Sequence, residues 1–188
     1  MFETFRQDVA RWVVQGQFAD PATITTMLAL KLLFRQMSLR AVAWFRLGGW
    51  FKRHHVPFMP GYIQRRLLRV FGLEISPGAE VGGGLYIAHP VGVVIFAQRI
   101  GRNCSVIANV TIGMRTKWEF PVIGDNVFIG AGARVLGGIT VGDNARIGAN
   151  AVVIKDVPAD ATAIGVPAVN TLRQSAGGTQ EAGKGSGA

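Results

Sequence analysis

The chain has 188 residues, a hydrophobic content of 49% and a formal net charge of +9, which suits one domain, or one domain with an appendage. Its 25 glycines follow no Gly-X-Y period, so a collagen-like rod is excluded. The single cysteine, Cys104, excludes an internal disulfide and points to a reducing compartment.

The first part of the chain, residues 1–73, is rich in Leu, Met, Trp, Phe and Arg and is predicted to form an N-terminal helical region. Helices are expected near residues 3–15, 22–37, 38–53 and 60–71. The expected breaks are Asp20-Pro21, Val56-Pro57 and Met59-Pro60-Gly61. Thr23 or Thr25 is the expected cap of the second helix.

This part contains no segment that is typical of an export signal or a membrane span. Charges occur in the first residues, where a signal peptide needs an apolar run. The longest apolar stretch, residues 22–34, contains Lys31 and is too short to cross a bilayer. We therefore expect a cytoplasmic protein.

Residues 21–73 carry nine Lys or Arg residues and no Asp or Glu. Such charge suits nucleic acid, anionic lipid or a phosphorylated substrate, and a solvated basic helix face explains it equally well. Charge is the only feature that points to nucleic acid, so no binding of nucleic acid is expected. A basic and aromatic helical region would suit peripheral association with the inner face of the cytoplasmic membrane.

From residue 75 onward, aliphatic residues recur every six positions. Ten of the twelve intervals are six residues, one is seven and one is eleven. The series is Ile75, Val81, Ile87, Val93, Ile100, Val106, Ile112, Ile123, Ile129, Val135, Val141, Ile147 and Val153. A period of six fits neither a helix nor a simple strand, but it fits a chain that turns a corner every six residues. Three such sides make one triangular coil, and the aliphatic side chains stack inside the resulting prism.

Two segments fall outside this repeat. The eleven-residue interval between Ile112 and Ile123 predicts a loop extruded from the prism, and it offers Arg115, Lys117, Trp118 and Glu119. The C-terminal residues 169–188 are poor in hydrophobic residues and rich in glycine, so they are expected to form a mostly disordered tail.

The repeat resembles that of the hexapeptide-repeat acyltransferases, which implies a mainly β fold, a left-handed parallel β-helix over residues 74–168. Three segments narrow the resemblance to serine acetyltransferases and the related acetyltransferases of bacterial polysaccharide synthesis. They are GLEISPGAEVGGGLYIAHPVGVVI, NVTIGMR and PVIGDNVFIGAGARVLGGITVGDNARIGANAVVIKDVPADATAIGVPA.

The resemblance implies that His89 is the general base that deprotonates the acceptor hydroxyl, with Glu74 as the carboxylate that orients it. The residue types suit the reaction, because an imidazole is the natural base at neutral pH. A carboxylate on its other nitrogen sets the tautomer and stabilises the imidazolium. The 15-residue separation is close to one coil, so the two side chains are expected on adjacent coils.

The resemblance also implies that acetyl-CoA binds in the groove between two prisms of a homotrimer, with a hexamer as the alternative. Gly113, Ala131 and Ala149 are the positions that match the pantetheine track. Arg146 and Lys155 are the expected partners of the nucleotide phosphates.

The acceptor is inferred from departures from the serine acetyltransferase pattern. Those enzymes carry an aspartate before the histidine, where this chain has Ala88, and an arginine–histidine pair in the loop, where it has Glu119-Phe120. The expected acceptor is therefore a sugar hydroxyl in exopolysaccharide synthesis, bound by Arg115, Trp118 and Phe120.

The alternatives are serine O-acetylation in cysteine synthesis and a non-catalytic β-helix scaffold. A metal enzyme of the superfamily needs three histidine ligands, and the prism supplies only His89, so no metal is expected.

Overall fold

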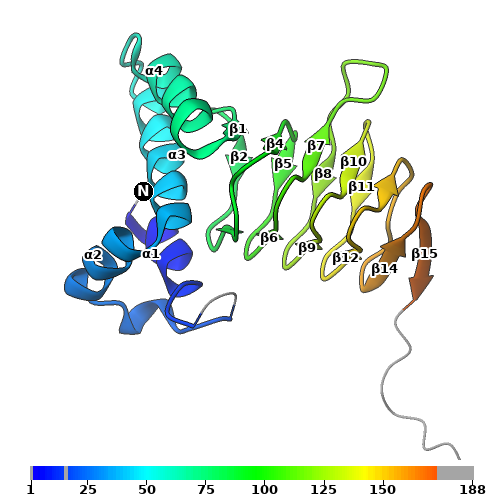
Figure 1. Ribbon diagram of the computed structural model, residues 1–188, viewed down its shortest axis with the longest axis horizontal. Coiled ribbons are helices and arrows are strands. Elements are labelled where there is room, and N and C mark those ends of the chain that lie inside the picture. Colours follow the sequence, from blue (N-terminus) through cyan, green and yellow to red (C-terminus); the bar gives the residue numbers. More distant parts are fainter. Residues whose placement is uncertain (1, 15–16, 173–188) are drawn as a thin grey trace, which may run out of the picture.

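The computed structural model describes residues 2–14 and 17–172, which form a helical region joined to one end of a long solenoid of short strands (Figure 1). The expected disordered tail begins at residue 169. Its first four residues belong to a strand, and residues 173–188 lie outside the described range. Within that range, every helix is too short or too polar to serve as a membrane span.

The helical region contains the four helices that the sequence predicts. The elements are α1 (Phe2–Ala10), η1 (Pro21–Thr23), α2 (Thr26–Arg35), α3 (Met37–Arg53), α4 (Met59–Arg66) and η2 (Leu67–Phe71). Thr25 is the cap of α2, since its hydroxyl accepts a hydrogen bond from the Leu28 amide at 3.2 Å. The break expected at Met59-Pro60-Gly61 is instead the first turn of α4. Proline is tolerated there because the first helical amides have no partner within the helix.

The solenoid has three faces, which we name A, B and C. Face A holds β1 (Leu73–Ile75), β4 (Val93–Ile95), β7 (Thr111–Gly113), β10 (Arg134–Leu136) and β13 (Val152–Val153). Face B holds β2 (Glu80–Val81), β5 (Arg99–Ile100), β8 (Val122–Ile123) and β11 (Thr140–Val141). Face C holds β3 (Tyr86–Ile87), β6 (Ser105–Val106), β9 (Phe128–Ile129), β12 (Arg146–Ile147), β14 (Ala161–Ile164) and β15 (Val169–Leu172). All strand pairs are parallel except β14 with β15.

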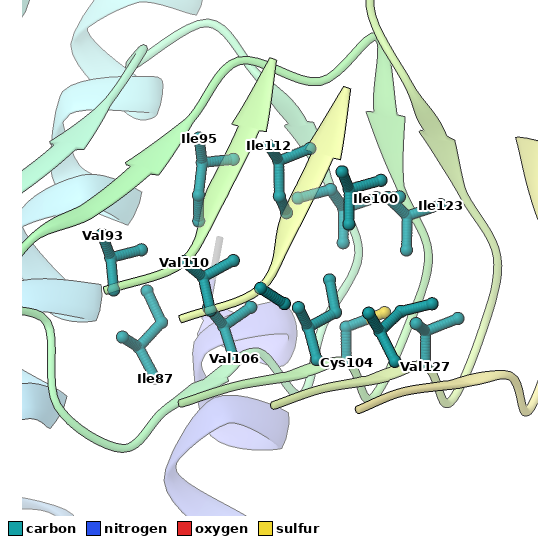
Figure 2. Packing of buried hydrophobic residues seen from close by; sticks show 14 of the residues in the cluster. Ile87, Val93, Ile95, Ile100, Cys104, Val106, Val110, Ile112, Ile123 and Val127 are labelled. Carbon is teal, nitrogen blue, oxygen red and sulfur yellow. The ribbon is translucent and has the colours of Figure 1, made fainter. Parts of the chain in front are cut away.

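The core is a set of stacked aliphatic columns, as the six-residue period predicts. Figure 2 shows Ile95 beside Ile112 and Ile100 beside Ile123, and all four are at most 1% exposed. Each coil removes its apolar side chains from water only by stacking on the next coil. Burial of one such side chain contributes about 1.5–3 kcal/mol, so the columns are the main source of the solenoid's stability.

Asparagines form many of the corners, which the six-residue period of aliphatic residues does not predict. Asn103, Asn126 and Asn144 have positive φ angles of 58–59°, a conformation in which Asn is among the few tolerated side chains. Their side-chain amides are hydrogen-bonded in series, Asn103 to Asn126 at 3.3 Å and Asn126 to Asn144 at 3.2 Å. This ladder locks successive corners between faces B and C.

The register corrects one member of the aliphatic series. Ile95, not Val93, lies in the column of Ile75 and Ile112, because β4 pairs with β1 and β7 in that register. Eight residues lead from Ile87 to Ile95, whereas six lead from Val106 to Ile112. The first corner between faces C and A therefore contains two additional residues.

Buried charged side chains attach the helical region to the first coils. The Asp8 carboxylate on α1 pairs with Arg46 on α3 at 2.8 Å and accepts a hydrogen bond from the Leu85 amide at 2.8 Å. Arg11 donates to the Asn103 carbonyl and the Ser105 hydroxyl, both at 2.8 Å. Burial raises the pKa of Asp8, and Arg46 opposes that rise. Helices and solenoid are thus one packed unit.

Candidate active site

His89 lies in the expanded corner between faces C and A, and its side chain is exposed. The backbone on both sides of it is fixed. The Ala88 amide donates to the Val106 carbonyl at 3.0 Å, and the Val93 amide donates to the Pro90 carbonyl at 3.1 Å. Pro90 itself is buried. The two additional residues thus hold the imidazole outside the core on a well-anchored segment.

A serine that the sequence analysis missed contacts this segment. Ser38 on α3 is 9% exposed and donates its hydroxyl hydrogen to the Ala88 carbonyl at 2.8 Å. The hydrogen bond joins the helical region to the residue directly before His89. No repeat or spacing in the sequence reveals this contact, because residues 38 and 88 meet only through the tertiary fold.

Glu74 lies near the same end of the solenoid. In β1, Leu73 and Ile75 are buried and Glu74 between them points outward from face A, opposite Val94 in β4. The corner that carries His89 leads directly into β4. The strand pairing therefore places Glu74 on face A of the first coil and His89 at the corner that enters face A of the second coil. Among the described residues, neither side chain makes a hydrogen bond with another protein group.

The predicted acetyl-CoA residues fall on two edges and one face of the solenoid. Ala131 and Ala149 follow the edge between faces C and A, the edge that also carries His89, and the Asn150 amide donates to the Ala131 carbonyl at 2.8 Å. Gly113 is the last residue of β7 and Lys155 follows β13, both at the edge between faces A and B. Arg146 lies on face C, its guanidinium 4.8 Å from the centre of the Phe128 ring.

Gly113 differs from most glycines of the prism. A side chain at Gly82, Gly101 or Gly130 would approach the next coil's backbone within 2.7 Å, so packing alone requires glycine there. A Cβ atom at Gly113 would meet nothing within 4 Å. Packing does not require glycine at this position, which leaves room for the close approach of a ligand to the backbone.

The predicted loop leaves the solenoid between β7 and β8, where Figure 1 shows it projecting from the strands. Trp118 is 80% exposed, and its ring meets that of Phe120 edge-on at 5.3 Å. Arg115 is exposed as well. The loop starts from the edge between faces A and B, so within one protomer it belongs to a different edge from His89.

The described residues contain no group of three His, Cys, Asp or Glu side chains placed to hold a metal ion. Cys104 is buried, and this burial raises the pKa of its thiol to about 11. His54 and His55 are exposed at the end of α3, far along the chain from the expanded corner.

The chain is similar to known transferases in sequence and in structure. The family described as "Bacterial transferase hexapeptide (six repeats)" matches residues 120–155. The serine acetyltransferase of Staphylococcus xylosus is 41% identical over 157 residues, covering 79% of this chain and 69% of the relative. That of Synechococcus elongatus is 38% identical over 152 residues, and the match covers 79% of this chain but only 61% of the relative.

Solved structures of serine acetyltransferases are similar to this chain as well. Neisseria gonorrhoeae serine acetyltransferase in complex with serine superposes with a TM-score of 0.75 at 32% identity, over 89% of this chain and 68% of that one. A serine acetyltransferase in complex with CoA gives a TM-score of 0.75 at 30% identity, also over 89% and 68%. The expected left-handed β-helix with N-terminal helices is confirmed by these neighbours.

The expected sugar acceptor is wrong. The relatives are named serine acetyltransferases, and one of the matching structures holds serine. Ala88 packs against the helical core cluster of Val9, Trp12 and Tyr86, so packing accounts for this residue. The Glu119 side chain lies against Gly138 of the next coil, so packing accounts for its position as well.

Proposed function

Because the chain belongs to the serine acetyltransferase family, we propose that it transfers the acetyl group of acetyl-CoA to the hydroxyl of L-serine. The observation that carries the proposal is the exposed imidazole of His89 on an expanded, anchored corner of the solenoid. An exposed imidazole held by a rigid scaffold suits a general base that must reach a bound hydroxyl.

In the proposed reaction, His89 accepts the proton of the serine hydroxyl as its oxygen attacks the thioester carbonyl carbon. The tetrahedral intermediate then collapses, the C–S bond breaks, and the leaving thiolate takes the proton from the imidazolium. The products are O-acetylserine and CoA. Glu74 acts as a positioning carboxylate that stabilises the imidazolium, and backbone amides of the coil corners supply donors for the oxyanion.

The distribution of candidate residues supports a site shared between protomers of a trimer. His89, Ala131 and Ala149 occupy one edge, whereas Gly113, Lys155 and the loop occupy another. Two prisms side by side would bring the first edge of one protomer to the second edge of its neighbour. Arg146 and Lys155 would then meet the CoA phosphates, and Arg115, Trp118 and Phe120 would border the acceptor.

The test is the rate of CoA release from acetyl-CoA with L-serine and, separately, with a panel of sugars and nucleotide sugars. We expect turnover with serine and not with the sugars. His89→Ala should lower the rate about 10²–10⁴-fold. Glu74→Gln should lower kcat and leave KM nearly unchanged. His55→Ala, an exposed histidine outside the site, is the matched control and should retain full activity.

Two results would reject the proposal. One is turnover with serine that survives His89→Ala. The other is absence of turnover with serine in a protein that binds acetyl-CoA, which would favour the non-catalytic scaffold.

A further inference from the structure

A cavity of about 820 Å³ lies between α3 and the first two coils of face B. We name it the face B pocket and define it by the charged residues that line it, which are Arg46, Lys52, Arg53, Glu80, Arg99 and Arg102. Because His89 lies at the edge between faces C and A, the pocket is on the opposite side of the prism. Neither the loop nor any acetyl-CoA candidate lines it.

Arg46 brings no net charge to the face B pocket. Arg46 is paired with the Asp8 carboxylate at 2.8 Å and donates to the carbonyls of Val81 and Gly82 at 2.7 and 2.5 Å. These contacts use the guanidinium to attach the helices to the first coil. The pocket's net charge therefore comes from its other residues.

Four further cations line the pocket, and one of them, Arg102, is paired with the Asp125 carboxylate at 2.8 Å. The other three converge on the pocket from two elements. Lys52 and Arg53 come from the last turn of α3, where the helix dipole already favours positive charge. Arg99 comes from β5, opposite Glu80 in β2, and the helix dipole does not account for it. Within the described part of the chain, none of the three forms an ion pair with a carboxylate. With Glu80 counted, two positive charges face the cavity.

We propose that the face B pocket binds a small molecule through a dianionic phosphate group. Two uncompensated positive charges match a phosphate monoester or phosphate dianion, and the planar guanidinium forks of Arg53 and Arg99 suit phosphate oxygens. A cavity of about 820 Å³ is within the usual size range of small-molecule sites, roughly 300–1,000 Å³. The pocket therefore has room for an organic group beyond the phosphate.

Gly78 allows the pocket to be changed without removing a charged side chain. A Cβ atom at this position would lie 1.9 Å from the Lys52 ammonium nitrogen, so Gly78→Ala must displace that ammonium. The obstructing atom is the end of a flexible side chain, and the backbone of Gly78 has no positive φ. The substitution is therefore expected to change the pocket without loss of the fold.

The test is calorimetric titration of the full chain with glucose 6-phosphate and, separately, with inorganic phosphate. One series contains saturating CoA, so that a phosphate site for CoA is already filled, and a second series contains no CoA. We expect binding that Arg99→Gln, Lys52→Gln and Gly78→Ala each weaken about tenfold, the scale of one lost charged hydrogen bond. Arg65→Gln, an exposed cation of α4 outside the pocket, is the matched control and should bind like the wild type.

Binding of either probe with this pattern supports a phosphate site in the pocket. The probe that binds more tightly shows whether the phosphate belongs to an organic ester or is free phosphate. Three results would overturn it: no binding of either probe, equal binding by the pocket variants, or binding that appears only without CoA. The last would assign the anion to the acetyl-CoA site. Since none of these readouts requires turnover, they are independent of the proposed acetyl transfer.

Discussion

Two additional residues at one corner determine where the imidazole of His89 lies. The corner from Ile87 to Ile95 is longer than its equivalents in the later coils, and this length carries the histidine outside the packed columns. Ser38 fixes the neighbouring carbonyl from the helical side. At the scale of single residues, the site is an exposed base held by buried contacts.

The first residue-scale prediction concerns that hydrogen bond. Ser38→Ala removes the donor to the Ala88 carbonyl and should lower the free energy of unfolding by about 1 kcal/mol. Because the carbonyl adjoins His89, kcat should fall while KM for acetyl-CoA stays the same. Ser38→Thr keeps the hydroxyl and should restore most of kcat. A stability loss with unchanged kcat would show that Ser38 has only a structural role.

Cys104 provides a second prediction. Burial raises the pKa of its thiol to about 11, so at pH 8 the group is protonated and shielded, and the reactive thiolate is scarce. A thiol reagent such as 5,5′-dithiobis(2-nitrobenzoate) should label the folded protein at the rate of unfolding. Addition of denaturant should make labelling fast. Rapid labelling of the native protein at pH 8 would contradict this assignment.

At the scale of elements, the attachment of α1 depends on a buried ion pair. Asp8→Ala leaves the Arg46 guanidinium without its carboxylate in a site where the Arg46 side chain is only 11% exposed. Removing one partner of a buried pair costs about 3–5 kcal/mol. Urea unfolding monitored by circular dichroism should show this loss. Arg102→Ala breaks the pair with Asp125 from its exposed side, since the Arg102 side chain is 71% exposed, and is the control, expected to change little.

Substitutions in the loop between β7 and β8 should change activity and leave stability unchanged. Trp118 is 80% exposed, so Trp118→Ala removes little packing from one protomer. If the loop borders the acceptor of a neighbouring protomer, kcat/KM for serine should fall about tenfold while the thermal midpoint stays unchanged. Phe58→Ala, an equally exposed aromatic outside the loop, is the matched control. Unchanged kinetics for Trp118→Ala would remove the loop from the site.

The elements also show what the sequence can and cannot predict. The period of six predicted the columns, the corners and the loop, because each is a local consequence of spacing. The register around Val93 was missed, since Val93 is also aliphatic and keeps the period while Ile95 occupies the column. Contacts such as Ser38 to Ala88 and Asp8 to Leu85 join distant segments, and no spacing encodes them. The prediction of a sugar acceptor was wrong, since the sequence does not show where the Ala88 side chain packs.

At the scale of the whole molecule, the proposed site needs more than one chain. The edge with His89 and the edge with the loop face different directions in a single protomer. Light scattering should therefore give the mass of three chains, or of a multiple of three. Co-expression of His89→Ala with Trp118→Ala should yield mixed assemblies with more activity than either variant alone. A monomeric active protein would contradict a shared site.

The most direct measurement of the central claim is the identity of the product. Acetyl-CoA labelled with ¹³C in the acetyl group is incubated with L-serine, and the mixture is followed by NMR. We expect that the wild type forms an acetyl ester on the serine oxygen and that His89→Ala, folded to the same extent, does not. No ester from the wild type, or equal ester from both proteins, would contradict it.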